Sequence, residues 1–251
     1  MARDGYKGKL ILPVLLTNQR QMNKKTERNP KTSLAATCID ASRAEGIWVV
    51  DSSLNDQEAK GNFGSVRFRG VVDFHQELNA MLTHCNISVA GPYWGMNLVV
   101  WARGIVSFAA VGVGKAYRYH IPGGLLKQSS TKFALPSLRR LVVRKPILRS
   151  WLVGSLQKIA KSDPAYSEFS ELVAQFGVLA DEDMARHQIG RFYENWIRQL
   201  EAAPPQSRSL ALYQNFSSAY VLGKSLSNIP SEEGPARSPS RIAEQFMRNC
   251  L

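Results

Sequence analysis

Residues 46–53, Gly-Ile-Trp-Val-Val-Asp-Ser-Ser, decide the fold class of this chain. Four apolar residues, rich in β-branched side chains, precede Asp51, a pattern typical of a buried strand that ends at a carboxylate. Apolar residues at helical spacing follow over 71–82, and a second short β-rich run, Ile-Ser-Val-Ala, occupies 87–90. A strand, a helix and a strand in this order predict a parallel βαβ unit.

Further segments extend this unit in both directions. Short apolar or β-rich runs predict strands near residues 10–16, 33–39 and 109–113, and residues 96–106 have the pattern of an apolar helix. Pro13 is compatible with the first strand only at an edge or a bulge. The alternation predicts an α/β fold in which the first half of the chain forms a parallel barrel or a barrel-like sheet.

The pattern changes to helices after Pro136. Apolar residues at helical spacing predict helices in the segments 138–161, 167–179, 184–202 and 241–251. Residues 210–226 form another apolar segment, which could include a final strand at 210–213, and residues 227–240 are expected to form a loop. We therefore expect a barrel-like catalytic part over residues 1–130 and a basic, mainly helical part over residues 131–251.

The positive charge of the chain is concentrated in one acid-free stretch. The 251 residues carry a formal net charge of +12, and residues 78–162 contain no Asp or Glu but twelve Lys and Arg. This asymmetry is typical of a protein that binds the phosphate backbone of nucleic acid, although a basic face that serves solubility, or that binds an acidic protein or lipid, has the same composition. Backbone contacts are expected from Lys115, Lys127, Lys132, Arg139, Arg140, Arg144, Lys145 and Arg149.

The composition disfavours several classes of protein. No apolar run approaches the roughly 20 residues that a membrane span needs. The three cysteines form no CxxC pair, and the four histidines form no HxH or HExxH pair. We therefore expect no membrane anchor, no metal and no other cofactor, and a cytoplasmic location. His75 and His84 are expected at the surface.

The candidate site lies at the carboxyl ends of the predicted strands, where parallel α/β sheets carry their chemistry. Asp51 is the candidate catalytic residue, because a carboxylate at a buried strand end can act as a nucleophile, a general base or an electrostatic stabiliser. A turn or N-cap role is an equal alternative for Asp51. In the turn that begins at Gly91, Tyr93 or Trp94 could stack on a base. Substrate contacts are expected from Ser52, Asp56, Gly91, Tyr93, Trp94, Asn97, Gly112, Gly114, Tyr117, Arg118 and His120.

Short motifs in this region resemble the DNA-modifying relatives of the tRNA-guanine transglycosylase superfamily. Residues 101–104, Trp-Ala-Arg-Gly, residues 111–115, Val-Gly-Val-Gly-Lys, and then Arg118 are similar to a helix that ends in glycine, a VGVGS strand and a following basic residue in those proteins. Residues 49–53, Val-Val-Asp-Ser-Ser, are similar to their strand-end Asp-Ser-Gly. The resemblance implies a TIM-like barrel that acts on an N-glycosidic bond in DNA or RNA, with Asp51 as the active-site aspartate. We expect DNA as the partner in preference to RNA.

The sequence also departs from this family. Ser53 replaces the glycine of Asp-Ser-Gly, the zinc-binding cysteine cluster is absent, and no second strand-end aspartate follows Gly114. Base exchange needs an intermediate that is held until a new base arrives, whereas one carboxylate and water suffice for hydrolysis. We therefore expect a glycosylase that flips out and removes a modified base of DNA. Removal of modified phage bases in antiviral defence is one setting that is consistent with this activity.

Three other functions stay open. The chain could be a base transglycosylase acting on DNA or tRNA, or a non-enzymatic nucleic-acid-binding subunit that uses the basic helices after Pro136. A nuclease is the third alternative. Most nucleases need clustered carboxylates that bind a metal, and here such a cluster could be assembled from Asp40, Asp51 and Asp56.

Overall fold

The structure is a computed structural model, which describes residues 8–16, 36–40, 44–51, 68–83, 85–91, 95–111, 131–230 and 236–250. The chain divides into two compact units. The described residues up to 111 belong to the first, here called unit 1, and those from 131 onward belong to the second, called unit 2. The division expected after residue 130 separates the described residues into the same two groups.

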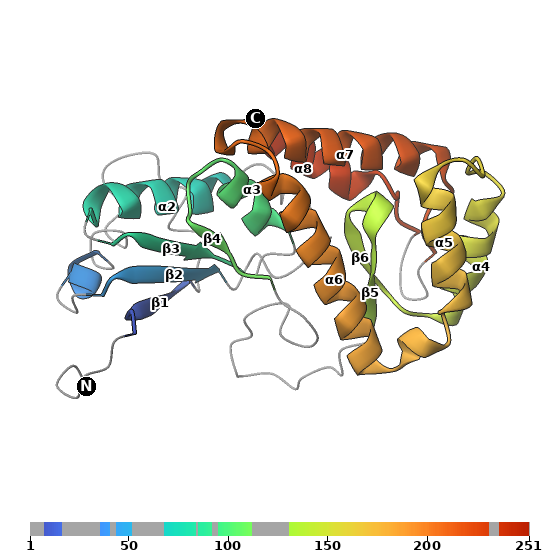
Figure 1. Cartoon of the computed structure of the whole chain (residues 1–251), viewed down its shortest axis with the longest axis horizontal. Helices are drawn as coiled ribbons and strands as arrows, with labels where there is room; N and C mark the ends of the chain where they lie inside the picture. Colours follow the sequence, from blue (N-terminus) through green and yellow to red (C-terminus); the bar gives the residue numbers. More distant parts are fainter. Residues whose placement is uncertain are drawn as a thin grey trace. The chain divides into compact units, whose positions relative to one another are not determined.

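Unit 1 is built on a parallel sheet (Figure 1). Its described strands are, in spatial order, β1 (Ile11–Leu16), β2 (Gly46–Asp51), β3 (Ile87–Ala90) and β4 (Phe108–Ala109), and each pair of neighbours is parallel. Helix α2 (Phe68–Met81) lies between β2 and β3 in the chain, and helix α3 (Met96–Ala102) lies between β3 and β4. The predicted parallel α/β arrangement is confirmed.

The described strands form an open sheet, with β1 and β4 at its two edges. The edge position explains how β1 accommodates Pro13, which has no N–H to donate. Within the described sheet β1 pairs with β2 alone, so its other side needs no donor from a strand. In the register of this pair, Pro13 lies opposite Trp48. A closed barrel is not seen among the described strands.

A buried apolar layer joins the sheet of unit 1 to α2. Ile47 and Val49 of β2 are buried together with Phe74 and Leu78 of α2 in one core cluster. Phe74 and Leu78 are four residues apart, so they lie on the same face of the helix. Figure 1 shows α2 running along one face of the sheet, and this packing leaves the carboxyl ends of the strands as an edge of the layer.

Residues 36–40 are helical, so the strand predicted over 33–39 is wrong for its described part. Ala36 and Ile39 are buried in the core cluster of unit 1, whereas Cys38 between them is exposed. Burial at a spacing of three residues belongs to a helix and not to a strand, in which every second residue would be buried. Alanine, the best helix former, stands at positions 35 and 36 of this segment and favours the same outcome.

His75 is buried within α2, contrary to the expected surface position. Its side chain is 0% exposed, and neither ring nitrogen forms a hydrogen bond with the described residues. Burial lowers the pKa of His75 to about 4, because the charged imidazolium would lose its hydration. The imidazole is therefore neutral at physiological pH. His84 lies outside the described residues.

Unit 2 combines a β-hairpin with helices. Strand β5 (Lys132–Leu135) pairs antiparallel with β6 (Arg140–Val143), and the short 3-10 helix η4 (Pro136–Leu138) and Arg139 connect them. The remaining elements are α4 (Pro146–Leu156), α5 (Pro164–Ala174), η5 (Val178–Ala180), α6 (Glu182–Glu201), η6 (Pro205–Ser207), α7 (Arg208–Ser225) and α8 (Arg241–Cys250). The mainly helical character expected for this part is confirmed.

Two predicted elements of unit 2 are wrong. The basic helix expected over 138–161 begins only at Pro146, because residues 140–143, Arg-Leu-Val-Val, pair with β5 as a strand. Proline is favoured in the first turn of a helix, where its missing N–H would have no partner in any case. The strand considered at 210–213 is instead part of α7.

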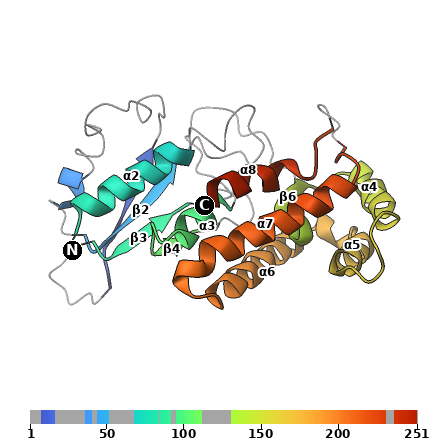
Figure 2. The same cartoon turned by 90° about the horizontal axis from the view of Figure 1, so that it is seen from above.

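The close approach of α7 to the start of α8 depends on Gly223. These helices lie side by side in both views (Figures 1 and 2). A Cβ atom at Gly223 would lie 2.6 Å from the backbone nitrogen of Ser240 and 2.8 Å from its Cα. Such distances are well inside van der Waals contact, so the two backbones would have to separate.

We expect Gly223→Ala to destabilise unit 2 by about 1–3 kcal/mol, the usual cost of overpacking. Gly190→Ala in α6 is the matched control, because a Cβ there would have no neighbour within 4 Å. Alanine in an open helical position should stabilise by roughly 0.5–1 kcal/mol. Thermal unfolding of the two variants checks this prediction, and equal melting temperatures would contradict it.

Candidate functional site

Because the four described strands of unit 1 are parallel, their carboxyl ends lie on the same side of the sheet. In the strand register, Leu16 at the end of β1 lies opposite Asp51 at the end of β2, and Ala90 at the end of β3 lies opposite Ala109 of β4. The backbone of Asp51 therefore ends its strand at the edge where parallel α/β sheets carry their chemistry. We call this edge the strand-end rim.

The backbone of Gly91, just after β3, forms hydrogen bonds with β2 at the strand-end rim. Its N–H donates to the carbonyl oxygen of Val49 at 3.2 Å, and its own carbonyl accepts a 2.7 Å hydrogen bond from Nε1 of Trp48. Gly91 has a φ of +113°, and a Cβ at this position would lie 2.5 Å from the carbonyl oxygen of Ala110. Glycine is thus required here for close packing of the chain against itself, in addition to any approach of a ligand.

Asn97, near the start of α3, faces the same packed region. Its side chain is 0% exposed, and Nδ2 donates a 2.5 Å hydrogen bond to the carbonyl oxygen of Ala110. Its Oδ1 is buried and accepts no hydrogen bond from the described residues. An amide oxygen can accept two hydrogen bonds, so Asn97 keeps unused acceptor capacity beside the rim.

Many of the residues expected in the site lie outside the described part of the chain. For Asp51 the structure describes the backbone but not the surroundings of the side chain. The predicted site residues that lie outside it altogether are Ser52, Asp56, Tyr93, Trp94, Gly112, Gly114, Lys115, Tyr117, Arg118, His120 and Lys127.

Three arginines expected to contact a phosphate backbone are engaged in packing within unit 2. Arg140 is 2% exposed, donates from Nη1 to the carbonyl oxygen of Ser238, and burial lowers its pKa to about 10. The guanidinium of Arg144 donates from Nε to the carbonyl oxygen of Phe176 at 2.9 Å and lies 4.7 Å from the centre of that ring. Arg139 stacks similarly, 4.9 Å from the ring centre of Trp196.

Burial corrects the prediction for Arg140, whose guanidinium would have to leave its partners in unit 2 to reach a phosphate. Arg139 and Arg144 are half-buried, and for them phosphate contact stays a prediction. Lys132 and Lys145 are half-buried. Of the eight predicted backbone contacts, Arg149 on α4 is described as exposed. Two further lysines from the acid-free stretch, Lys158 and Lys161, are exposed just after α4.

No protein-family model, curated protein or solved structure matches the chain. The described residues contain no group of three or more His, Cys, Asp or Glu arranged to hold a metal ion. Within the same residues, no helix is both long enough and apolar enough to cross a bilayer.

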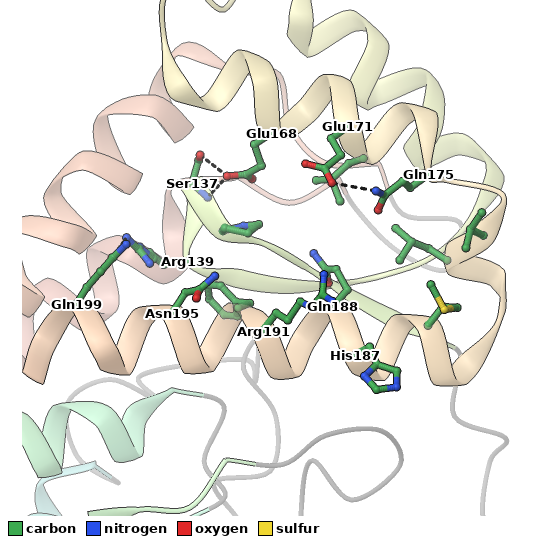
Figure 3. Close-up of a pocket in the computed structure, with 16 residues that line it drawn as sticks. Ser137, Arg139, Glu168, Glu171, Gln175, His187, Gln188, Arg191, Asn195 and Gln199 are labelled. Carbon is green, nitrogen blue, oxygen red and sulfur yellow. Dashed lines mark hydrogen bonds between the residues drawn. The ribbon is translucent and has the colours of Figure 1, made fainter.

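A second candidate site is a groove of about 830 Å³ inside unit 2. It lies between α5 and α6 and is backed by the hairpin (Figure 3). Apolar side chains such as Leu172, Leu179 and Phe192 line part of it, and the rest of the lining is polar or charged. We call it the α5–α6 groove. A pocket of several hundred Å³ with a few convergent polar groups is typical of small-molecule sites.

Glu168 is a strongly perturbed titratable group of the α5–α6 groove. Its Oε2 accepts hydrogen bonds from the backbone N–H and the Oγ of Ser137, at 2.8 and 2.5 Å. Its Oε1 is buried and accepts no hydrogen bond from the described residues. Burial raises the pKa of Glu168 to about 7, and the Ser137 hydrogen bonds and the charge of Arg139 oppose this rise.

The α5–α6 groove was not predicted from the sequence. Glu168, Glu171 and Gln175 follow one another at helical spacing, which places them on one face of α5. That signal is present in the sequence, but a polar helical face is usually solvated. This face of α5 differs from a solvated helical face because it lies opposite α6. That arrangement depends on contacts between residues far apart in the chain.

Proposed function

We propose that the chain binds nucleic acid, DNA in preference to RNA, and that unit 1 hydrolyses the N-glycosidic bond of a modified base. Asp51 is the catalytic carboxylate in this proposal. The observation that supports it most directly is the position of Asp51 at the end of β2, on the strand-end rim. The proposal includes the TIM-like barrel that the family resemblance implies, of which the sequential parallel strands would form a part.

The chemistry requires few groups. As the bond between the base and the sugar carbon breaks, positive charge develops on the sugar, and a nearby carboxylate stabilises it. Water supplies the oxygen that replaces the base, and its proton leaves with the base or passes to the carboxylate.

The test is the product formed from DNA that carries modified bases. Free base and abasic sites, formed in the presence of EDTA, support the proposed glycosylase. Nicks that appear only with added metal would instead indicate a nuclease, and incorporation of a new base would indicate a transglycosylase. Binding without any product would leave the non-enzymatic subunit as the function of the chain.

One observation favours that binding subunit as a second candidate. Arg149, Lys158 and Lys161 are exposed on and just after α4, within a stretch of sequence that has no acidic residue. Nζ of Lys158 donates to Oγ of Ser227 at 2.6 Å, and its ammonium group stays exposed to solvent. Exposed basic residues are suited to phosphate contacts, which need no catalytic site.

We expect the triple variant Arg149→Glu, Lys158→Glu, Lys161→Glu to weaken nucleic-acid binding and to flatten its dependence on salt. Each lost phosphate contact should reduce the slope of log affinity against log salt by about 0.9 on duplex DNA. The control variant, Lys224→Glu with Arg241→Glu, reverses exposed charges on α7 and α8. Fluorescence anisotropy at several salt concentrations measures both slopes, and equal slopes for the two variants would exclude α4 as the contact surface.

A further inference from the structure

The two walls of the α5–α6 groove carry opposite charges. The α5 wall presents Glu168 and Glu171, and the α6 wall presents Arg191 together with the amide of Asn195 (Figure 3). Arg191 and Asn195 have no interaction partner among the described residues. A polyanion would meet the carboxylates of the first wall, and a simple cation would meet the guanidinium of the second. The groove is therefore suited to a ligand that carries both charges.

On the α5 wall, Glu168 is the residue best suited to bind a cationic group. Its Oε2 is already held by Ser137, which fixes the direction of the carboxyl group. Its Oε1, buried and without a hydrogen-bond donor, lacks a partner that a ligand N–H could supply. An unsatisfied buried acceptor is costly, so a donor delivered by a ligand gains more here than it would at the surface.

Arg139 does not fill this position, although it lies in the same groove. Its guanidinium is directed to Trp196, whose ring it covers, and to the side-chain oxygen of Gln199 at 3.4 Å. Arg139 adopts a left-handed backbone conformation with a φ of +50°, which follows from its place at the end of η4. The guanidinium thus contributes charge to the groove, and among the described residues no group donates to the buried Oε1 of Glu168.

We propose that the α5–α6 groove binds a small amino acid whose cationic side chain donates to Glu168 and whose carboxylate meets Arg191 and Asn195. Leu172, Leu179 and Phe192 contact the aliphatic part of the ligand. Amino acids with a cationic side chain have this chemistry. This binding site is independent of the base hydrolysis proposed for unit 1, so failure of one proposal does not affect the other.

The groove predicts a pH dependence of binding. A cation binds the ionised form of Glu168, so affinity should rise as the pH increases through about 7, where this carboxyl group loses its proton. The other charged groups of the groove are Glu171 on α5, Arg139 after η4, and Arg191 and His187 on α6. His187 is exposed and points away from α5 in Figure 3, so it is not positioned to replace Glu168 as the titrating group.

The test uses the full chain, isothermal titration calorimetry and three matched probes. L-Arginine has both charges, L-citrulline has nearly the same shape but a neutral end group, and agmatine lacks the carboxylate. We expect saturable binding of L-arginine and at least tenfold weaker binding of both other probes. Absence of saturable L-arginine binding at pH 8, or equal binding of L-citrulline, overturns the proposal.

Two variants assign the binding to the groove. Glu168→Gln should reduce L-arginine affinity by roughly tenfold to a hundredfold, the usual range for losing a hydrogen bond to a charged group, and should abolish its pH dependence. Glu201→Gln, at the exposed end of α6, is the control and should bind as the wild type does. If Glu168→Gln does not fold, Arg191→Gln is used in its place. This variant should lose affinity for L-arginine and L-citrulline, which carry a carboxylate, but not for agmatine. Unchanged affinity in the folded variant overturns the proposal.

Discussion

Replacement of Asp51 by asparagine is expected to reduce base release by about 10²–10³-fold, the typical cost of losing one electrostatic contact to a transition state. The amide is nearly isosteric with the carboxylate but carries no charge, so it can neither stabilise positive charge on the sugar nor attack the sugar carbon. Folding and nucleic-acid binding should stay close to those of the wild type. Single-turnover base release, affinity and melting temperature, measured on the same preparation, check all three expectations.

A different role for Asp51 gives a different result. If this residue caps a turn, Asp51→Asn should cost about 1 kcal/mol of stability or less and leave base release nearly normal. Asp73→Asn, an exposed aspartate of α2 in the same unit, is the control for the chemical change alone. Normal base release by Asp51→Asn would remove this residue from the catalytic site and, with it, most of the support for the glycosylase.

Acidification is expected to destabilise unit 1 through His75. In the unfolded chain this imidazole has a pKa near 6.5, whereas burial lowers it to about 4 in the folded chain. Between these values the unfolded state binds more protons, so the free energy of unfolding falls as the pH falls. At about 1.4 kcal/mol per pH unit, the loss amounts to roughly 3 kcal/mol between pH 6.5 and 4.

The contribution of His75 can be isolated with His75→Leu, which has no charge to bury. Compared with the wild type at each pH, this variant should lack the loss of stability between pH 6.5 and 4. His187→Leu, an exposed position on α6, is the control. The comparison at each pH is needed because Glu168 acts in the opposite direction: its raised pKa means that unit 2 loses stability as the pH increases from about 4.5 to 7. Parallel stability curves for wild type and His75→Leu would contradict the prediction.

The sequence was sufficient to predict the elements of unit 1 whose patterns are local. The β-rich runs that form β1, β2 and β3, and the helical spacing that forms α2, each lie within a few consecutive residues. The segment at 36–40 was predicted wrongly, since short apolar runs of this kind are compatible with both periods. Packing of Ala36 and Ile39 against the sheet decides between them.

The functional residues were harder to predict than the fold. A run of basic residues indicates charge but not exposure. Arg140 in the hairpin is buried, and Arg144 packs against the ring of Phe176. The same limit applies to Glu168. Its hydrogen-bond partner Ser137 lies 31 residues earlier in the chain. The burial of its Oε1 depends on the packing of η4, α5 and α6, which the sequence does not specify locally.

The side chain of Gln188 has a consequence for how the hairpin meets other chains. From α6, its Oε1 accepts the N–H of Ala134 at 2.7 Å and its Nε2 donates to the carbonyl oxygen of the same residue at 2.9 Å. The amide thus imitates one residue of a neighbouring strand along the outer side of β5. An exposed strand edge invites pairing with a strand of another molecule, which leads to domain swapping and aggregation. At Ala134 the backbone N–H and C=O are both bonded to Gln188, so a strand of another molecule could pair with β5 at this residue only by displacing that side chain.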